Sequence, residues 1–216
     1  MPSGAVVLYA DAFWISPYVF TCYVALREKE VPFDVRPVAL QTKEQRLPSY
    51  QSRTLTGRVP AIDHGDFTMA ESNAIVDYLE EAFPPPAHPA VYPTDLRQRA
   101  RARQLLGWIR TDLMPIREER STHTMFYARA TAPLSAAGRD ALDRLVFVAE
   151  ELVTEGKPTL FDTFSIADAD LAFMLHRLLL NGDPVPPKLA TYARAVWTRP
   201  SIREFIERER IPYVPY

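Results

Sequence analysis

Apolar and polar positions in the N-terminal third of the chain alternate between a strand period and a helical period. Residues 5–10 (AVVLYA) form an apolar run typical of a buried strand, and residues 33–38 (FDVRPV) alternate as a second strand does. Between these strands, apolar side chains recur at helical spacing from Ser16 to about Lys29. The pattern also predicts a brief helix within 43–52, short strands at 60–63 and 67–69, and an amphipathic helix at 71–83.

Prolines interrupt this pattern between Pro84 and Pro89, where they remove backbone donors and block helix continuation. No strand pattern returns after them, so we expect an α/β domain over 1–84, a Pro-rich linker over 85–93 and an all-helical domain over 94–216. The helices of the second domain are expected at 95–112, 135–155, 166–180, 187–198 and 201–209. The segment from Ser165 to Asp168 has the form of a capping box, which indicates a folding role at the start of a buried helix.

The composition and net charge of the chain exclude several classes of partner and cofactor. Apolar residues make up 47% of the chain and the formal net charge is -2, which predicts a packed core and gives no reason to expect nucleic acid or a membrane as partner. The single cysteine excludes a disulfide framework and fits a reducing compartment, so we expect a cytoplasmic protein. The histidines lack metal-ligand spacing and there is no glycine-rich phosphate loop, so neither a metal nor a nucleotide cofactor is expected.

The Ser16-Pro17 pair opens the first predicted helix. Serine is a strong N-cap and proline is favoured at the first helical position, so the pair has a purely structural interpretation. The same geometry also has a chemical interpretation, because the N-terminus of a helix stabilises an anion. A thiolate held there by a hydroxyl donor would have a lowered pKa, and the thiolate is the reactive form of a thiol.

Two further features follow along the chain. Arg58-Val59-Pro60 precedes the third strand, where a proline is ordinary. Glu71-Ser72 opens the next helix, where an acid and a hydroxyl either complement the helix dipole or recognise the ammonium and carboxylate of an amino-acid head group. Each feature is weak alone, whereas their order and spacing are specific.

In this order the features resemble the glutathione S-transferase family. Ser16-Pro17-Tyr18-Val19 stands where a thioredoxin-like fold places Cys-Pro-Tyr-Cys, with both thiols replaced. The resemblance covers nearly the whole chain, and across ARARQLLGWIRTDLMPIREER it is similar to bacterial serine-type members of the YfcF kind. It implies an α/β thioredoxin-like N-terminal domain followed by an all-α helical C-terminal domain.

The resemblance implies a role for each matching residue. Ser16 would donate a hydrogen bond to the thiolate of glutathione, and would be the catalytic residue. Val59, before an expected cis Pro60, would pair its backbone with the cysteinyl part of glutathione, and Glu71 and Ser72 would hold the γ-glutamyl end.

Arg58 and Gln45 fall where serine-type members place polar residues facing the glycyl carboxylate, and Gln45 is the weaker match. Thr54 and Leu55 stand where many members have Asn-Pro, which indicates a differently shaped loop. Tyr9 lies near the catalytic tyrosine of tyrosine-type members, so it is the alternative to Ser16 unless it is a core aromatic.

The function implied is conjugation of the glutathione thiolate to small hydrophobic electrophiles. The acceptor site is expected between the domains, lined by Phe13-Trp14 and residues 108–117, with the aromatic tail 211–216 over it. The alternatives are a glutathione-dependent peroxidase and a non-catalytic glutathione-fold binding protein. Glutathione is then the co-substrate, and the resemblance also implies a homodimer.

Overall fold

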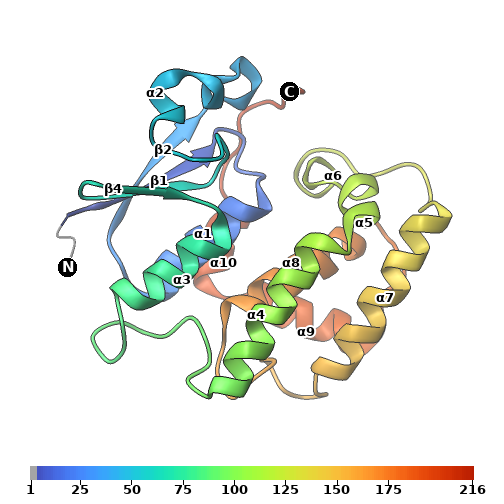
Figure 1. The fold of residues 1–216 in the computed structure, drawn as a ribbon. Helices are drawn as coiled ribbons and strands as arrows, with labels where there is room; N and C mark the ends of the chain where they lie inside the picture. The colour runs from blue at the N-terminus through green and yellow to red at the C-terminus, as the bar shows by residue number, and fades with distance from the viewer. Residues whose placement is uncertain (1–3) are drawn as a thin grey trace. The chain divides into compact units, whose positions relative to one another are not determined.

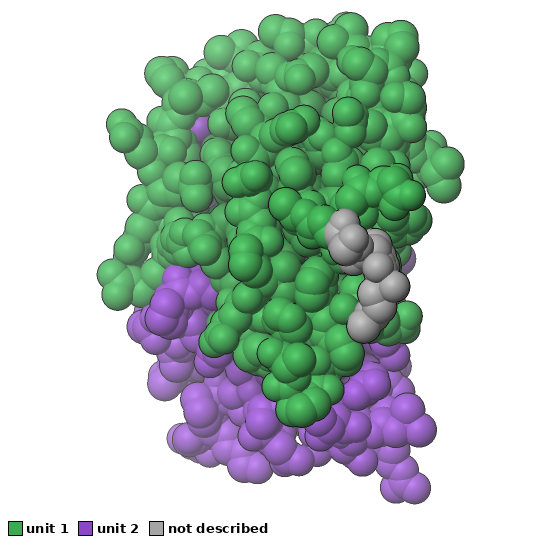
Figure 2. Space-filling view, turned by 90° about the vertical axis from the view of Figure 1, so that its left-hand side faces the viewer, with its two compact units in different colours: residues 1–91, 203–216 green, residues 92–202 purple. Residues whose placement is uncertain are grey.

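The computed structural model describes residues 4–216. The chain divides into two compact units, one of Met1–Val91 with Arg203–Tyr216 and one of Tyr92–Ile202. Figure 2 colours the two units separately. None of the helices formed by residues 4–216 is long and apolar enough to cross a membrane.

The first unit is built on a mixed sheet of four strands in the order β2-β1-β3-β4. Strand β1 runs parallel to β2 and antiparallel to β3, which pairs antiparallel with β4. The β2 strand matches its predicted bounds and lies at the edge of the sheet, where a strand tolerates a proline such as Pro37. The bounds of the strands are Val6–Asp11, Phe33–Val38, Ala61–His64 and Phe67–Ala70.

Helices cover both faces of this sheet. Helices α1 (Pro17–Glu28) and α3 (Ser72–Ala82) lie on one face, and α2 (Pro48–Gln51) lies on the other (Figure 1). Where a brief helix was predicted within 43–52, the chain forms a 3-10 turn, Glu44–Arg46, followed by α2; another 3-10 turn, Leu40–Thr42, precedes this range. Helix α1 is buried along almost its whole length because its apolar residues occupy every side of it.

The second unit is all-helical within the described residues. Its centre is α8, whose residues from Ile166 to Leu178 are buried all round and which packs against α4, α6 and α9. Asp168 accepts hydrogen bonds from the Ser165 backbone N–H (2.8 Å) and hydroxyl (2.9 Å), so these two predicted residues do act together at the start of this helix. The helices are α4 Leu96–Thr111, α5 Met114–Glu119, α6 Thr122–Phe126, α7 Ala136–Leu152, α8 Ile166–Leu179, α9 Pro187–Trp197 and α10 Pro200–Ile206, which crosses into the first unit.

The sequence pattern missed α5 and α6. Helix α4 ends at Thr111, one residue before the end expected from the sequence, and Pro115 lies in the first turn of α5. Both missed helices are too short to show a full apolar period, so neither stood out in the sequence.

The C-terminal segment Arg203–Tyr216 groups with the first unit, whereas the sequence pattern assigned it to the helical domain. The cause is aromatic packing: the fully buried ring of Phe205 lies 5.3 Å from that of Phe20 and 5.6 Å from that of Trp14. The C-terminal segment therefore belongs to the same compact unit as the N-terminal strand β1.

The first unit also holds the start of the predicted linker. Lys29 is fully buried and donates to the Glu80 carboxylate (2.7 Å) and the Pro89 carbonyl (3.0 Å). The same Glu80 oxygen accepts the backbone N–H of Val91 at 3.1 Å. The boundary between the units, after Val91, falls inside the expected linker 85–93.

Candidate functional site

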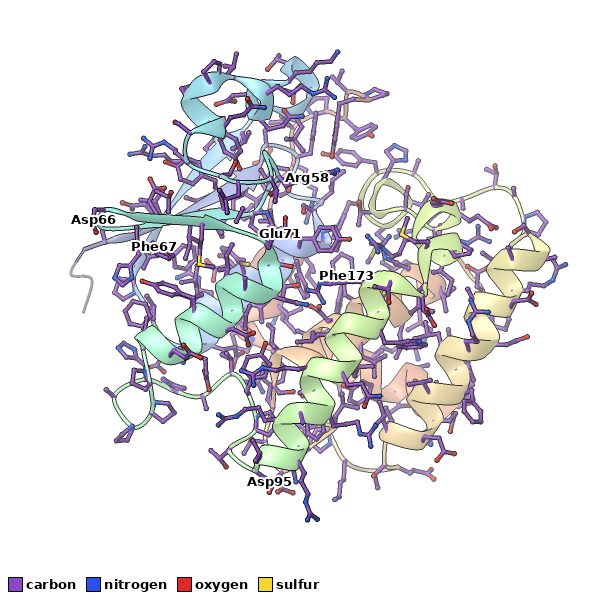
Figure 3. The ribbon with its side chains drawn as sticks, viewed as in Figure 1. Arg58, Asp66, Phe67, Glu71, Asp95 and Phe173 are labelled. Atoms are coloured by element: carbon purple, nitrogen blue, oxygen red, sulfur yellow. The ribbon has the colours of Figure 1, made fainter. Side chains whose placement is uncertain are left out.

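The predicted site residues of the first unit gather where three strands end or begin. Ala61 pairs with both Tyr9 of β1 and Ala70 of β4, so Pro60, Glu71 and the residues that follow Tyr9 share one edge of the sheet. The Val59-Pro60 peptide bond is cis, as the resemblance implied. Figure 3 labels Arg58 and Glu71 at this edge, and the edge is the candidate site.

Ser16 caps the N-terminus of α1. Its backbone is extended (φ -65°, ψ 120°), and its Oγ accepts the backbone N–H of Val19 at 3.3 Å. A hydroxyl has one donor and two acceptor sites, and this contact uses one acceptor. The hydroxyl proton of the half-buried Ser16 donates to none of residues 4–216, so it is available to a ligand.

Asp11, which sequence reasoning did not single out, sets the position of Ser16. Its fully buried carboxylate accepts the backbone N–H groups of Ile15 (2.9 Å) and Ser16 (3.1 Å). Burial raises the pKa of Asp11, while the two amide donors act in the opposite direction. The signal that could have found it is an acid that ends an apolar strand just before a helix cap.

The backbone of Val59 is available at the same edge. Within residues 4–216 neither its N–H nor its carbonyl has a hydrogen-bond partner. Its side chain packs on a small core cluster of Tyr9, Val38, Leu40, Tyr50 and Ala61. The residue is thus anchored by its side chain while its two backbone groups remain open to a ligand.

Glu71 and Ser72 join β4 to α3. Glu71 is exposed and has a φ of 76°, a conformation that side chains other than glycine rarely adopt. Its carboxylate forms no ion pair or hydrogen bond with residues 4–216. Ser72 is buried, and its carbonyl accepts the Sγ–H of the buried Cys22 at 3.7 Å, which places Cys22 in the core.

Arg58 and Gln45 lie beside this edge. The Arg58 side chain is exposed, while its carbonyl accepts the Tyr50 hydroxyl at 2.8 Å. The side-chain oxygen of Gln45 is buried without a hydrogen-bond partner in the described chain. The Gln45 carbonyl would lie 3.5 Å from a Cβ at Gly57, so the two segments are adjacent.

The loop that departs from the family pattern has its own support. The Thr54 hydroxyl accepts the backbone N–H of Gly57 at 3.0 Å, and Gly57 has a φ of 62° that suits glycine. Leu55 is fully exposed. A threonine thus supports the turn that leads into Arg58.

Tyr9 is engaged elsewhere. Its hydroxyl donates to Asp63 Oδ2 at 2.8 Å and accepts from the Arg36 guanidinium at 3.4 Å. Burial raises the pKa of Tyr9, and the contact with Asp63 adds to this. The side chain is only 6% exposed, so these contacts support the interpretation of Tyr9 as a core aromatic.

The C-terminal tail lies against the loop that precedes Ser16. The rings of Tyr213 and Tyr216 lie 5.3 and 5.8 Å from that of Phe13. The guanidinium of Arg208 lies 3.8 Å from the ring centroid of Trp14, in cation–π geometry. The tail thus covers Phe13, which the sequence had suggested as a lining residue of the acceptor site.

Known proteins match both parts of this arrangement. Residues 12–87 match the family model of the glutathione S-transferase N-terminal domain, and residues 95–209 match that of the C-terminal domain. A glutathione transferase homologue from Burkholderia, solved with bound glutathione, is 37% identical with a TM-score of 0.77, covering 94% of this chain and 96% of that one.

Two curated proteins are also similar to this chain. Maleylpyruvate isomerase of a Ralstonia species is 30% identical over 171 residues, which are 74% of this chain and 76% of the relative. Glutathione S-transferase T3 of Arabidopsis thaliana is 29% identical over 87% of this chain, but the match spans only 32% of the relative's length. The chain belongs to the glutathione S-transferase family.

Proposed function

We propose that this protein is a glutathione transferase that joins the glutathione thiolate to small hydrophobic electrophiles. Within the family we assign it to the serine-type, YfcF-like members. The observation that carries the proposal is Ser16: a half-buried hydroxyl at the N-terminus of α1 whose proton no residue in 4–216 accepts.

The charges at the edge of the sheet suit glutathione, which carries an ammonium and two carboxylates. The exposed carboxylate of Glu71 binds the ammonium, and the N-terminal end of α3 at Ser72 binds the γ-glutamyl carboxylate. The exposed guanidinium of Arg58, with Gln45 beside it, binds the glycyl carboxylate. The open backbone groups of Val59 pair with the cysteinyl unit.

The chemistry follows from placing the sulfur at Ser16. The thiol proton leaves to solvent, and the remaining thiolate accepts the hydroxyl proton of Ser16 as a hydrogen bond at the positive end of α1. Lowering the thiol pKa by about two units corresponds to roughly 2.7 kcal/mol of thiolate stabilisation. The sulfur then forms a bond to the electrophilic carbon, and the leaving group departs with the bonding electrons. A thiolate with a lower pKa is also a weaker nucleophile, so the reaction rate rises by a smaller factor than the fraction of thiol that is ionised.

The direct test compares Ser16→Ala with Tyr9→Phe. With glutathione and an aryl halide electrophile, we expect Ser16→Ala to lose about two orders of magnitude in kcat/KM and Tyr9→Phe to lose little. Full activity in Ser16→Ala would show that the assignment is wrong. Cumene hydroperoxide in parallel separates transferase from peroxidase activity, and binding of glutathione without turnover of either compound would identify a binding protein.

We also propose that the protein is a homodimer. The first unit exposes apolar side chains that a second copy can cover: Leu55 is fully exposed and Phe67 is 42% exposed. Light scattering is expected to give twice the mass of one chain. A single-chain mass at micromolar concentration would contradict the dimer.

A further inference from the structure

Arg210 joins the C-terminal tail to the loop before Ser16. Its Nε donates to the Trp14 carbonyl at 3.2 Å. The remaining nitrogens of the same guanidinium donate to carbonyls just before the tail, those of Phe205 (2.9 Å) and Ile206 (3.0 Å) at the end of α10 and that of Arg208 (2.8 Å). One half-buried side chain therefore fixes the path of the tail and the position of the loop at the same time.

The loop needs such support because its conformation is unusual. Trp14 has a φ of 54°, which is disfavoured for a bulky side chain, and its N–H bonds the Asp11 carbonyl at 3.0 Å. The next two amides, of Ile15 and Ser16, donate to the Asp11 carboxylate. A left-handed residue immediately before these amides aims both of them at one carboxylate, so any rotation at Trp14 moves the Ser16 cap.

The positive charge of Arg210 also acts on Asp11. Arg210 contributes an attraction that favours the ionised form of this buried carboxyl. Burial raises the pKa of Asp11, whereas the hydrogen bonds from the amides of Ile15 and Ser16 and the positive charge of Arg210 lower it. Loss of Arg210 would therefore weaken both the conformation of the loop and the charge that holds it.

We propose that Arg210 is a positioning residue for the Ser16 hydroxyl, acting through Trp14 and Asp11, so that docking of the C-terminal tail sets the reactivity of the bound thiol. This inference rests on the proposed function of Ser16. It makes the tail part of the thiolate site rather than only a cover over Phe13.

Arginine suits this role in a way that lysine does not. The guanidinium presents a planar fork of donors, and here it serves four carbonyls in different directions. Arg203 is a matched control on the same segment: it is exposed and pairs with Glu207 one helical turn away. Replacing Arg203 with glutamine changes the net charge by the same amount as replacing Arg210, and it leaves the contacts with the loop before Ser16 intact.

The test compares wild type, Arg210→Gln and Arg203→Gln by two measurements. In hydrogen exchange resolved to single amides, we expect Arg210→Gln to speed exchange at Ile15 and Ser16 by about tenfold, with little change at the core amides of β1. In the pH profile of kcat/KM for conjugation, we expect its apparent thiol pKa to rise by about one unit. Arg203→Gln should match wild type in both.

The outcomes separate the two proposals. Unchanged exchange and an unchanged pH profile in Arg210→Gln would overturn the positioning role, as would faster exchange spread evenly over the whole first unit. If wild type itself neither binds nor turns over glutathione, the proposed function fails, and the exchange measurement alone still decides whether Arg210 holds the loop. If Arg210→Gln does not fold, Arg210→Lys, which keeps the charge but loses the fork, takes its place in both measurements.

Discussion

The buried carboxylate of Asp11 accepts the backbone N–H of Ser16 at 3.1 Å, so the residue that ends the first strand holds the residue that caps the first helix. A second amide, that of Ile15, shares this carboxylate at 2.9 Å. The proposed catalytic hydroxyl is thus placed by a buried acid five residues before it. In the proposed mechanism, the position of Ser16 therefore depends on an acid that lies outside the set of proposed ligand contacts.

Asp11→Asn tests this dependence. The carboxamide offers one oxygen where the carboxylate offers two, and its NH₂ group would face a backbone donor. Although the change removes a buried charge, we expect it to lower the free energy of unfolding by about 1–3 kcal/mol, because a buried amide loses its partner. Urea denaturation measures this. Equal stability of Asp11→Asn and wild type would show that the carboxylate is not needed to hold the loop.

Glu71 combines a strained backbone with a proposed ligand contact. Glu71 has a φ of 76°, and because glycine adopts this conformation without strain, its substitution by glycine relieves about 1 kcal/mol. We expect Glu71→Gly to be at least as stable as wild type but to bind glutathione about tenfold more weakly in calorimetry, because the partner of the ammonium is lost.

Glu71→Gln is the matched control, since it keeps the backbone strain and removes only the charge. It should bind glutathione nearly as weakly as Glu71→Gly while unfolding at the temperature of wild type. Wild-type affinity in both variants would remove Glu71 from the glutathione site.

The ion pair between Lys29 and Glu80 is buried, with side-chain exposures of 0% and 8%. Glu80→Gln leaves the Lys29 ammonium buried without its counter-charge, and we expect it to cost about 3–5 kcal/mol of stability. The exposed pair of Arg203 and Glu207 is the reference, and Glu207→Gln should leave the urea unfolding midpoint unchanged, because solvent screens an exposed ion pair. Adding Lys29→Met to Glu80→Gln should recover part of the loss; no recovery would argue against an uncompensated charge as the cause.

His176 predicts a pH dependence of stability. Burial lowers its pKa from 6.5 to about 4, and its ring stacks on Trp197 at 3.9 Å. The unfolded chain therefore binds this proton more readily than the folded one, so stability is lost as pH falls from about 6.5 to about 4. Its contribution over that window is roughly 3 kcal/mol.

His176→Phe keeps an aromatic ring against Trp197 and removes the titration. Between pH 7.5 and pH 4.5, chosen to bracket most of the window, the variant should lose less stability than wild type in urea denaturation. Parallel losses in the two proteins would show that His176 does not titrate as its burial indicates.

Local signals predicted much of the first unit. The strand at 33–38 and the capping of α1 by Ser16 follow from side-chain alternation and from the chemistry of serine and proline, which act over a few residues. The ligand contacts of Val59 and Glu71 were predicted from the resemblance to a family, which rests on several short motifs in a specific order, and they stay a prediction.

Features that depend on contacts between residues far apart in the sequence could not be predicted from the local pattern. An aspartate is usually exposed, so the place of Asp11 between an apolar strand and a helix cap is only a weak sign that its side chain is buried. The return of Phe205 and Arg210 to the first unit depends on packing against residues almost two hundred positions earlier. The left-handed conformation of Trp14 is likewise a product of its surroundings, because tryptophan has no local preference for it.

The central claim is that the Ser16 hydroxyl stabilises a bound thiolate. Its most direct test is an ultraviolet difference titration of the glutathione thiol bound to wild type and to Ser16→Ala. We predict that wild type lowers the thiol pKa by about two units relative to free glutathione, and that Ser16→Ala still binds glutathione but loses most of that shift. An identical thiol pKa in the two proteins would contradict the claim.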